Sequence, residues 1–179
     1  MMPSYKEEPI VILTFDTDNC PDLAIDFITE MLDEYGLCGT FFCTRKYKNI
    51  KPPHEEAIHP FITDFMSVEK IMEPVHKLKK EIPEAVGNRC HQLTSNGNLY
   101  AGLPDIGIKY ESSWPMILHE NIFPISFPSG LIQLPIFYGE GQFFDWGVTQ
   151  KFQKFFMSPG VKVLLFHPVH IYHNTNSNT

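Results

Sequence analysis

The chain has 179 residues, of which 43% are hydrophobic and 13% aromatic, enough for one core that hides roughly two thirds of the unfolded surface. Its 14 basic and 21 acidic residues give a net charge of -7, and no cluster of Lys and Arg is long enough to follow a phosphate backbone. We therefore expect no nucleic-acid partner.

The start of the chain, "MMPSYKEEP", lacks the charged and apolar regions of a signal peptide. The longest apolar runs, "IVILTF" and "VKVLLF", fall far short of the about 20 residues that cross a bilayer. The four cysteines form no C-x-x-C pair, and we expect them to be reduced. These features predict a cytoplasmic protein with one domain, residues 1–179.

Two sequence patterns alternate through the first two thirds of the chain. Continuous runs of β-branched and apolar residues, such as "PIVILTFD", are typical of strands buried on both faces. Apolar residues at helical spacing predict helices. The expected strands are 9–16, 38–44, 57–61, 85–91 and 107–113, and the expected helices are 21–36 and 67–82. Pro74 must either kink the second helix or open a second segment within it.

The last third predicts a strand at 131–137, a helix at 146–160 and a final buried strand at 161–172. Alternating strands and helices imply a parallel sheet. About seven strands in this length predict an α/β protein with a closed or nearly closed (β/α) barrel. Catalytic groups would then gather at the carboxyl ends of the strands.

Polar side chains follow several of these strands where each one ends. They are Asp16, Asp18, His59, Arg89, His91, His167 and His170. A single histidine near an apolar run is more often structural than functional, but several at the same rim of a barrel favour a site.

Asp16 and Asp18 stand two residues apart, and like charges that close force one carboxyl group to hold a proton unless a cation intervenes. One aspartate and two neutral imidazoles would give a divalent ion three ligands and an open position. The other aspartate could then act as a base.

At these residues the sequence resembles the polysaccharide deacetylase family with NodB homology, carbohydrate esterase family 4. "TFDTD" resembles the family's T-F-D-D motif stretched by one residue, and "VLLFH" resembles its final Leu-x-His motif. The WbmS-like branch is more similar still, with motifs G-x-H-P, R-S-H, G-I-x-Y-D-S-S and F-H-P-I-H-V-F-L-N-T. The matching stretches here are "AIHPF", "NRCHQL", "GIKYESS" and "FHPVHIYHNT". The resemblance implies an irregular, NodB-like (β/α) barrel.

Two motifs depart from the usual family pattern. The usual metal motif is His-Ser/Thr-x-x-His, but Thr63 stands four residues after His59, so the second imidazole must come from elsewhere. His91 is the first choice, and the thiolate of Cys90 is the alternative ligand. The usual R-x-P-Y-G motif is replaced by "RCHQL", which keeps Arg89 and loses the proline turn.

By resemblance, the reaction is removal of an acetyl group from an N-acetylated sugar. One divalent metal ion, with zinc the first choice, would be held by Asp18, His59 and His91, and would polarise the acetamide carbonyl and present a water. Asp16 would take the proton of that water as general base.

The resemblance implies roles for further residues too. Arg89 would fix the Asp16 carboxylate through a bidentate pair, and His167 would protonate the leaving amine, unless His170 takes that part. "FFDW" lies close to the family's fourth motif and keeps Asp145 and Trp146. The residues expected to contact the sugar are Trp114, Asp145 and Trp146, although packing in the core is an equally open role for the two tryptophans.

A small N-acetylated sugar, nucleotide-linked or lipid-linked, fits a cytoplasmic enzyme of lipopolysaccharide or O-antigen biosynthesis. Two other readings stay open. The protein could be another metal-dependent amide hydrolase, such as a deformylase acting on a small amine, or a metal-free sugar-binding relative. Loss of the usual second histidine favours the binder, whereas the retained Asp16, Asp18, Arg89 and His167 oppose it.

Overall fold

The structure is a computed structural model that describes residues 6–141 and 155–175. Within these residues, one sheet contains nine strands. The strands are β1 (Pro9–Asp16), β2 (Thr40–Cys43), β3 (Glu55–Ile58), β4 (Gly87–Asn88), β5 (Tyr110–Glu111), β6 (Ile125–Ser126), β7 (Ile132–Gln133), β8 (Ile136–Gly139) and β9 (Gly160–Phe166). The helices are α1 (Asp22–Glu34), α2 (Val68–Glu81), α3 (Gly97–Gly102) and α6 (Pro168–Tyr172), with short 3₁₀ turns η1 (His91–Leu93) and η2 (Pro104–Ile106).

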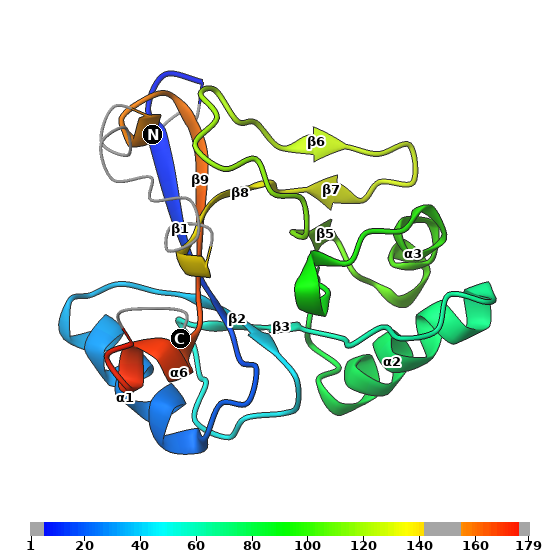
Figure 1. The fold of residues 1–179 in the computed structure, drawn as a ribbon, viewed down its shortest axis with the longest axis horizontal. Helices are drawn as coiled ribbons and strands as arrows, with labels where there is room; N and C mark the ends of the chain where they lie inside the picture. The colour runs from blue at the N-terminus through cyan, green and yellow to red at the C-terminus, as the bar shows by residue number, and fades with distance from the viewer. Residues whose placement is uncertain (1–5, 142–154, 176–179) are drawn as a thin grey trace.

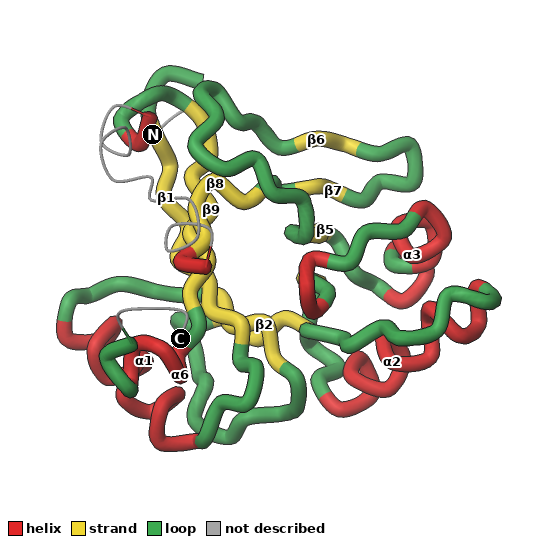
Figure 2. Tube along the Cα trace, in the orientation of Figure 1, coloured by secondary structure: helices red, strands yellow, loops and turns green. Residues whose placement is uncertain are grey.

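The strand order is β6-β7-β5-β4-β3-β2-β1-β9-β8, and the strands surround a common centre (Figure 2). Every pairing is parallel except that of β6 with β7. β1 pairs with β2 on one side and β9 on the other. The parallel strands therefore end at one rim, and that rim collects the polar residues that follow them.

The segment from β7 to β8 closes the ring. β7 pairs with β5, and β8 pairs with β9, yet Leu134 and Pro135 alone separate the two strands. Backbone hydrogen bonds strengthen the closure, because Ile136 N–H donates to the carbonyl of Trp114 at 2.8 Å. The prediction of an irregular (β/α) barrel is confirmed, and the antiparallel β6 is an addition that no sequence pattern indicated.

The helices cover the outside of the barrel in two groups, α1 with α6 and α2 with α3 (Figure 1). α1 buries Ala24, Ile25, Ile28 and Leu32 at helical spacing, as its sequence pattern predicts. α2 runs through Pro74 as one helix, so that proline opens no second segment. Within the described part of the chain, no helix combines the length and apolar character that crossing a bilayer would require.

Two predictions in the last third are wrong. The expected strand at 131–137 is divided into β7 and β8 at Leu134 and Pro135, since proline cannot donate to a sheet. The expected final strand at 161–172 ends with β9 at Phe166, and α6 begins at Pro168, whose ring is pre-set for the first helical position. Most of the expected helix at 146–160 lies outside the described residues.

Tyr110 and Glu111 are neighbours in β5, so their side chains point to opposite faces of the sheet. Tyr110 lines the barrel interior, and Glu111 is a buried carboxyl group on the other face. Glu111 is fully buried and accepts hydrogen bonds from the backbone N–H of Ser113, at 3.0 Å, and from the Ser113 hydroxyl. The same hydroxyl accepts the N–H of Cys90 at 3.0 Å. Burial raises the pKa of Glu111 to about 7, against the hydrogen bonds from Ser113 and the charge of Arg89.

This raised pKa predicts a component of stability that is lost as the pH rises from acidic to neutral. Folded Glu111 holds its proton more tightly than unfolded Glu111, so the contribution is complete below about pH 4.5 and is lost as the pH rises to about 7. Between pH 5 and pH 8 the wild type should lose about 2 kcal/mol more unfolding free energy than Glu111→Gln. Urea unfolding of both proteins at the two pH values measures the difference, and identical losses would contradict the assignment.

Candidate functional site

A cleft of about 280 Å³ opens at the rim where the parallel strands end. Its walls come from the ends of β1, β3 and β9, from the turn after β4 and from the second residue after β8. The lining residues are Asp16, Asp18, His59, His91, Gln92, Leu93, Gly141, Leu165 and His167. The structure therefore brings together in one cleft five of the seven polar residues predicted to share the rim, and a sixth, Arg89, lies beneath it in contact with Asp16.

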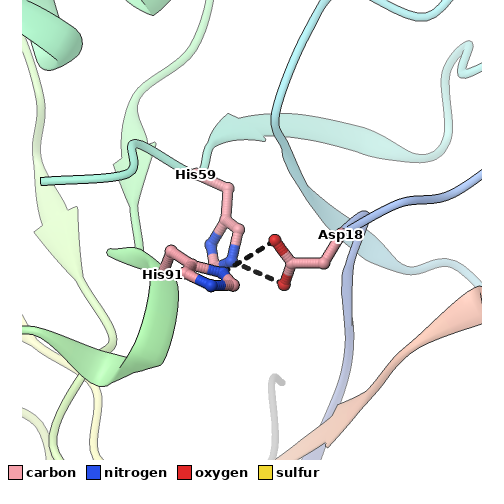
Figure 3. A group of neighbouring side chains, drawn as sticks. All are labelled: Asp18, His59 and His91. Carbon is pink, nitrogen blue, oxygen red and sulfur yellow. Dashed lines mark hydrogen bonds and ion pairs between the residues drawn. The ribbon is translucent and has the colours of Figure 1, made fainter.

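Asp18 lies at the centre of the cleft between two imidazoles. Its Oδ1 is 2.8 Å from Nδ1 of His91, and its Oδ2 is 3.1 Å from Nε2 of His59. Figure 3 shows both rings turned toward the carboxylate. One ligand atom from each of the three residues lies within 4.8 Å of the other two, a grouping that a single ion can bridge.

The tautomer of His59 leaves the lone pair of Nε2 available to a cation beside Asp18. Its Nδ1 lies 2.7 Å from the backbone carbonyl of Arg89, and a carbonyl only accepts, so Nδ1 carries a hydrogen. Nε2 of the neutral ring then presents a lone pair to the Asp18 carboxylate, which also only accepts. A proton or a metal ion must lie between them. The donor set of one carboxylate and two imidazoles fits a divalent ion such as zinc.

The charge of Asp18 is stabilised by its surroundings. Burial favours the neutral carboxyl, but the hydrogen bond with His59 and the attraction of the protonated forms of His59, His91 and His167 outweigh it and lower the pKa of Asp18. The carboxylate is thus ionised at neutral pH, the form in which it can bind a metal.

Asp16 lies beneath this group and is held by a buried arginine. Nη1 of Arg89 donates to Asp16 Oδ1 at 2.8 Å and to Thr14 Oγ1 at 2.9 Å. The expected bidentate pair is wrong, because Nε and Nη2 of Arg89 donate instead to the carbonyl and hydroxyl of Ser112, at 2.7 and 2.9 Å. The second oxygen of Asp16, Oδ2, lies 3.9 Å from His59 Nε2. One oxygen is therefore anchored, and the other faces the histidine beside the cleft.

His167 is the first residue after β9, and its ring is oriented by a glutamate that sequence reasoning missed. Oε1 of Glu140 lies 2.6 Å from His167 Nδ1 and accepts the His167 backbone N–H at 2.7 Å. Nε2 of His167 lies 3.7 Å from Asp18 Oδ2, on the cleft side. Burial opposes the charged ring, but the hydrogen bond that His167 donates to Glu140 and the charges of Asp16, Glu140 and Asp18 raise the pKa of His167. The available signal was "PIFYGE", an apolar run that ends in a carboxylate, as β1 does.

The sequence profile of the WbmS-like polysaccharide deacetylases matches residues 13–179. The chain belongs to this family. The family resemblance seen in the sequence motifs is thereby confirmed. A search of curated proteins found no match.

Solved structures show that this deacetylase-family chain shares its fold with several relatives. A candidate polysaccharide deacetylase from Bordetella bronchiseptica, described as involved in O-antigen biosynthesis, is 23% identical with a TM-score of 0.79, over 93% of this chain and 74% of that one. A candidate polysaccharide deacetylase from Mycobacterium smegmatis is 17% identical with a TM-score of 0.65, over 94% and 79%. A CE4-family pseudoenzyme from Bacillus anthracis is 14% identical with a TM-score of 0.58, over 89% and 54%.

In this WbmS-like protein, His91 and Cys90 face opposite ways. His91 reaches Asp18, whereas Cys90 is fully buried in the core and its sulfur accepts the side-chain N–H of Asn88 at 3.5 Å. Burial raises the pKa of the Cys90 thiol to about 12, which disfavours a thiolate. The geometry therefore favours the imidazole over the thiol as the third ligand.

The remaining predicted site residues lie apart from the cleft or outside the described residues. His170 is exposed on α6, with its ring centre 5.5 Å from that of His167. Trp114 packs on Phe127, and its Nε1 donates to the Tyr100 hydroxyl at 2.6 Å. It is absent from the described lining of the cleft. Asp145 and Trp146 lie outside the described residues.

Proposed function

We propose that this protein is a metal-dependent deacetylase that removes the N-acetyl group of a sugar. The proposed substrate is a nucleotide-linked or lipid-linked precursor of O-antigen, lipopolysaccharide or another surface polysaccharide, and the proposed location is the cytoplasm. The observation that carries the proposal is the group of Asp18, His59 and His91 next to an arginine-bound Asp16. The O-antigen role described for the B. bronchiseptica relative supports the choice of substrate.

Asp18, His59 Nε2 and His91 Nδ1 would hold one divalent ion, for which a mixed carboxylate and imidazole set favours zinc. When bound, the ion supplies Lewis acidity that polarises the acetamide carbonyl and makes a water molecule more acidic.

Asp16 would act as the general base. Its Oδ1 is tied to Arg89, which stabilises the ionised carboxylate, and its Oδ2 stays available to take a proton from the attacking water. Because Arg89 is itself fixed by Thr14 and Ser112, the base is held in one orientation before the substrate binds.

His167 would donate a proton to the leaving sugar amine through Nε2. Glu140 accepts the hydrogen of Nδ1, so the proton that moves is the one on the cleft side. Apolar side chains of Leu93 and Leu165 line the same cleft and offer a surface for the acetyl methyl group. A formyl group has no methyl to place there, which favours deacetylation over deformylation.

A metal-free sugar-binding role is the second candidate. Thr63 stands where the usual family metal motif has its second histidine. The two candidates differ in one measurable property, the binding of a metal ion.

The deciding experiment measures metal content and acetate release together. Zinc-loaded wild type should carry about one ion per chain and release acetate from N-acetylated sugars, and chelation should abolish the release. His59→Ala and His91→Ala should each weaken metal binding at least tenfold.

Cys90→Ser is the matched control and should keep the metal, because its sulfur lies in the core. Loss of metal from Cys90→Ser with retention in His91→Ala would reverse the ligand assignment. Elemental analysis that finds no metal under any loading condition would favour the sugar-binding role.

A further inference from the structure

A second group of metal-ligating side chains lies beside the cleft, at the ends of β8 and β9. Its members are Glu140, directly after β8, His167, directly after β9, and His170 on α6. One ligand atom from each residue lies within 4.8 Å of the other two. The donor set is one carboxylate and two imidazoles, as in the group around Asp18, yet the two groups share no residue.

The local sequence brings the three side chains together. Pro168 opens α6 directly after His167, and the backbone N–H of His170 donates to the His167 carbonyl at 3.0 Å. This turn places residues three apart on one side of the chain, and the two imidazole ring centres lie 5.5 Å apart. Glu140 is buried and contacts both the backbone N–H and Nδ1 of His167. Two ligands are therefore held in advance, and the exposed ring of His170 leaves the group open to an ion from solvent.

An ion in this group would compete with the proton of His167. The hydrogen on Nδ1 lies between that nitrogen and Glu140 Oε1, 2.6 Å away. An ion bound at Nδ1 replaces this hydrogen, and an ion bound at Nε2 takes the place of the proton that faces the cleft. In both cases one proton leaves the protonated ring for solvent. The neutral, metal-bound ring gives up its remaining hydrogen far less readily than imidazolium does, so it cannot protonate a leaving amine.

The two groups differ in what must change before an ion binds. In the group around Asp18, His59 Nε2 already presents its lone pair to the carboxylate. In the second group, His167 must first lose a proton, and the exposed side chain of His170 must become ordered. The group around Asp18 should therefore fill first, and the second group only when metal is in excess. Imidazole and carboxylate donors favour zinc or copper(II) over magnesium.

We propose that Glu140, His167 and His170 form a second, inhibitory metal site, where an ion bound in excess of the first removes the proton donor of the cleft. The ligand class is a divalent transition-metal ion. Binding at this site is independent of the proposed function, whereas the inhibition rests on it.

Titration of the whole chain with zinc chloride, followed by calorimetry, tests the site. The wild type should bind two ions, the second about tenfold or more weakly than the first, so that dialysis leaves about one ion per chain. His170→Ala and Glu140→Gln should each keep the first ion and weaken the second by about tenfold or more. His173→Ala is the matched control and should bind both ions, because His173 is an exposed histidine directly after α6 that is not in the group.

Acetate release measured against free zinc gives a second readout. For the wild type and His173→Ala, the rate should rise as the first ion binds and fall to below about a tenth of its maximum as the second binds. For His170→Ala, scaled to its own maximum, the fall should need about tenfold more zinc. An equal concentration of magnesium should cause no fall.

A single ion per chain at saturating zinc would overturn the proposal. So would a second ion whose affinity His170→Ala and Glu140→Gln both leave unchanged, or one that binds without slowing acetate release. Loss of the second ion from His173→Ala would mark an adventitious surface ion only, and would also overturn it.

The second site and the proposed function fail in different ways. If the second ion depends on His170 but no acetate is released at any zinc concentration, the second site is supported and the deacetylase assignment is lost. If acetate is released at a rate that stays constant as zinc rises beyond one ion per chain, the deacetylase stands and the inhibitory site is refuted.

Discussion

Asp16→Asn is expected to keep the metal while acetate release falls by about 10²- to 10⁴-fold, the range for losing a positioned base. The amide cannot take the proton that Asp16 Oδ2 is placed to accept. Asp18 and the two imidazoles that make up the metal group are untouched by the change. The measurements are zinc content and the turnover number of the variant beside those of the wild type.

Asp18→Asn is the paired variant and should lose metal and activity together, because Asp18 contacts both imidazoles. Arg89 is fully buried, and Asp16→Asn leaves its charge without a carboxylate partner. Thermal unfolding of Asp16→Asn must therefore confirm that the protein is folded at the assay temperature. Equal metal loss in both variants would show that both carboxylates are ligands and that the base lies elsewhere.

His167→Ala should lower turnover by about 10²- to 10⁴-fold with the metal retained, because the leaving amine then departs without a proton. The three residues proposed as metal ligands do not include His167. Turnover numbers under saturating substrate separate this effect from a loss of affinity.

Two further variants test Glu140 as the partner of His167 and His170 as the alternative proton donor. Glu140→Gln keeps an acceptor oxygen but removes the charge that favours the protonated ring, so turnover should fall by about tenfold to 100-fold. His170→Ala should change turnover little, since His170 is exposed on α6. A collapse of turnover in His170→Ala, with near-normal rates in His167→Ala, would reverse the two assignments.

The first half of the fold could be predicted because its signals are local. The apolar run of β1 indicates a buried strand, and the spaced apolar residues of α1 indicate a helix with one buried face. Neither prediction requires knowledge of the element against which they pack. Strand length could not be predicted in the same way. β4 and β5 each have two residues, because their pairing depends on the register of neighbours far along the chain.

The candidate site likewise contains residues that local patterns predicted and one residue that they did not. Asp16, Asp18, His59 and His91 follow predicted strands, and a parallel barrel brings such ends together. Glu140 follows the segment whose division into β7 and β8 was missed. The apolar run "PIFYGE" ends in its carboxylate, as β1 ends in Asp16, but nothing in that run indicated that Glu140 approaches His167.

The unequal lengths of the strand ladders give the two halves of the rim different resistance to local opening. β1 pairs with β9 over seven residues, whereas β3 pairs with β4 at one residue and β4 with β5 at two. Short ladders open at lower free energy than long ones. Asp18 follows the long ladder, and His91 follows the short one. An ion bound by both residues would therefore link the two parts of the barrel, and part of its binding free energy would stabilise the short-ladder part against local unfolding.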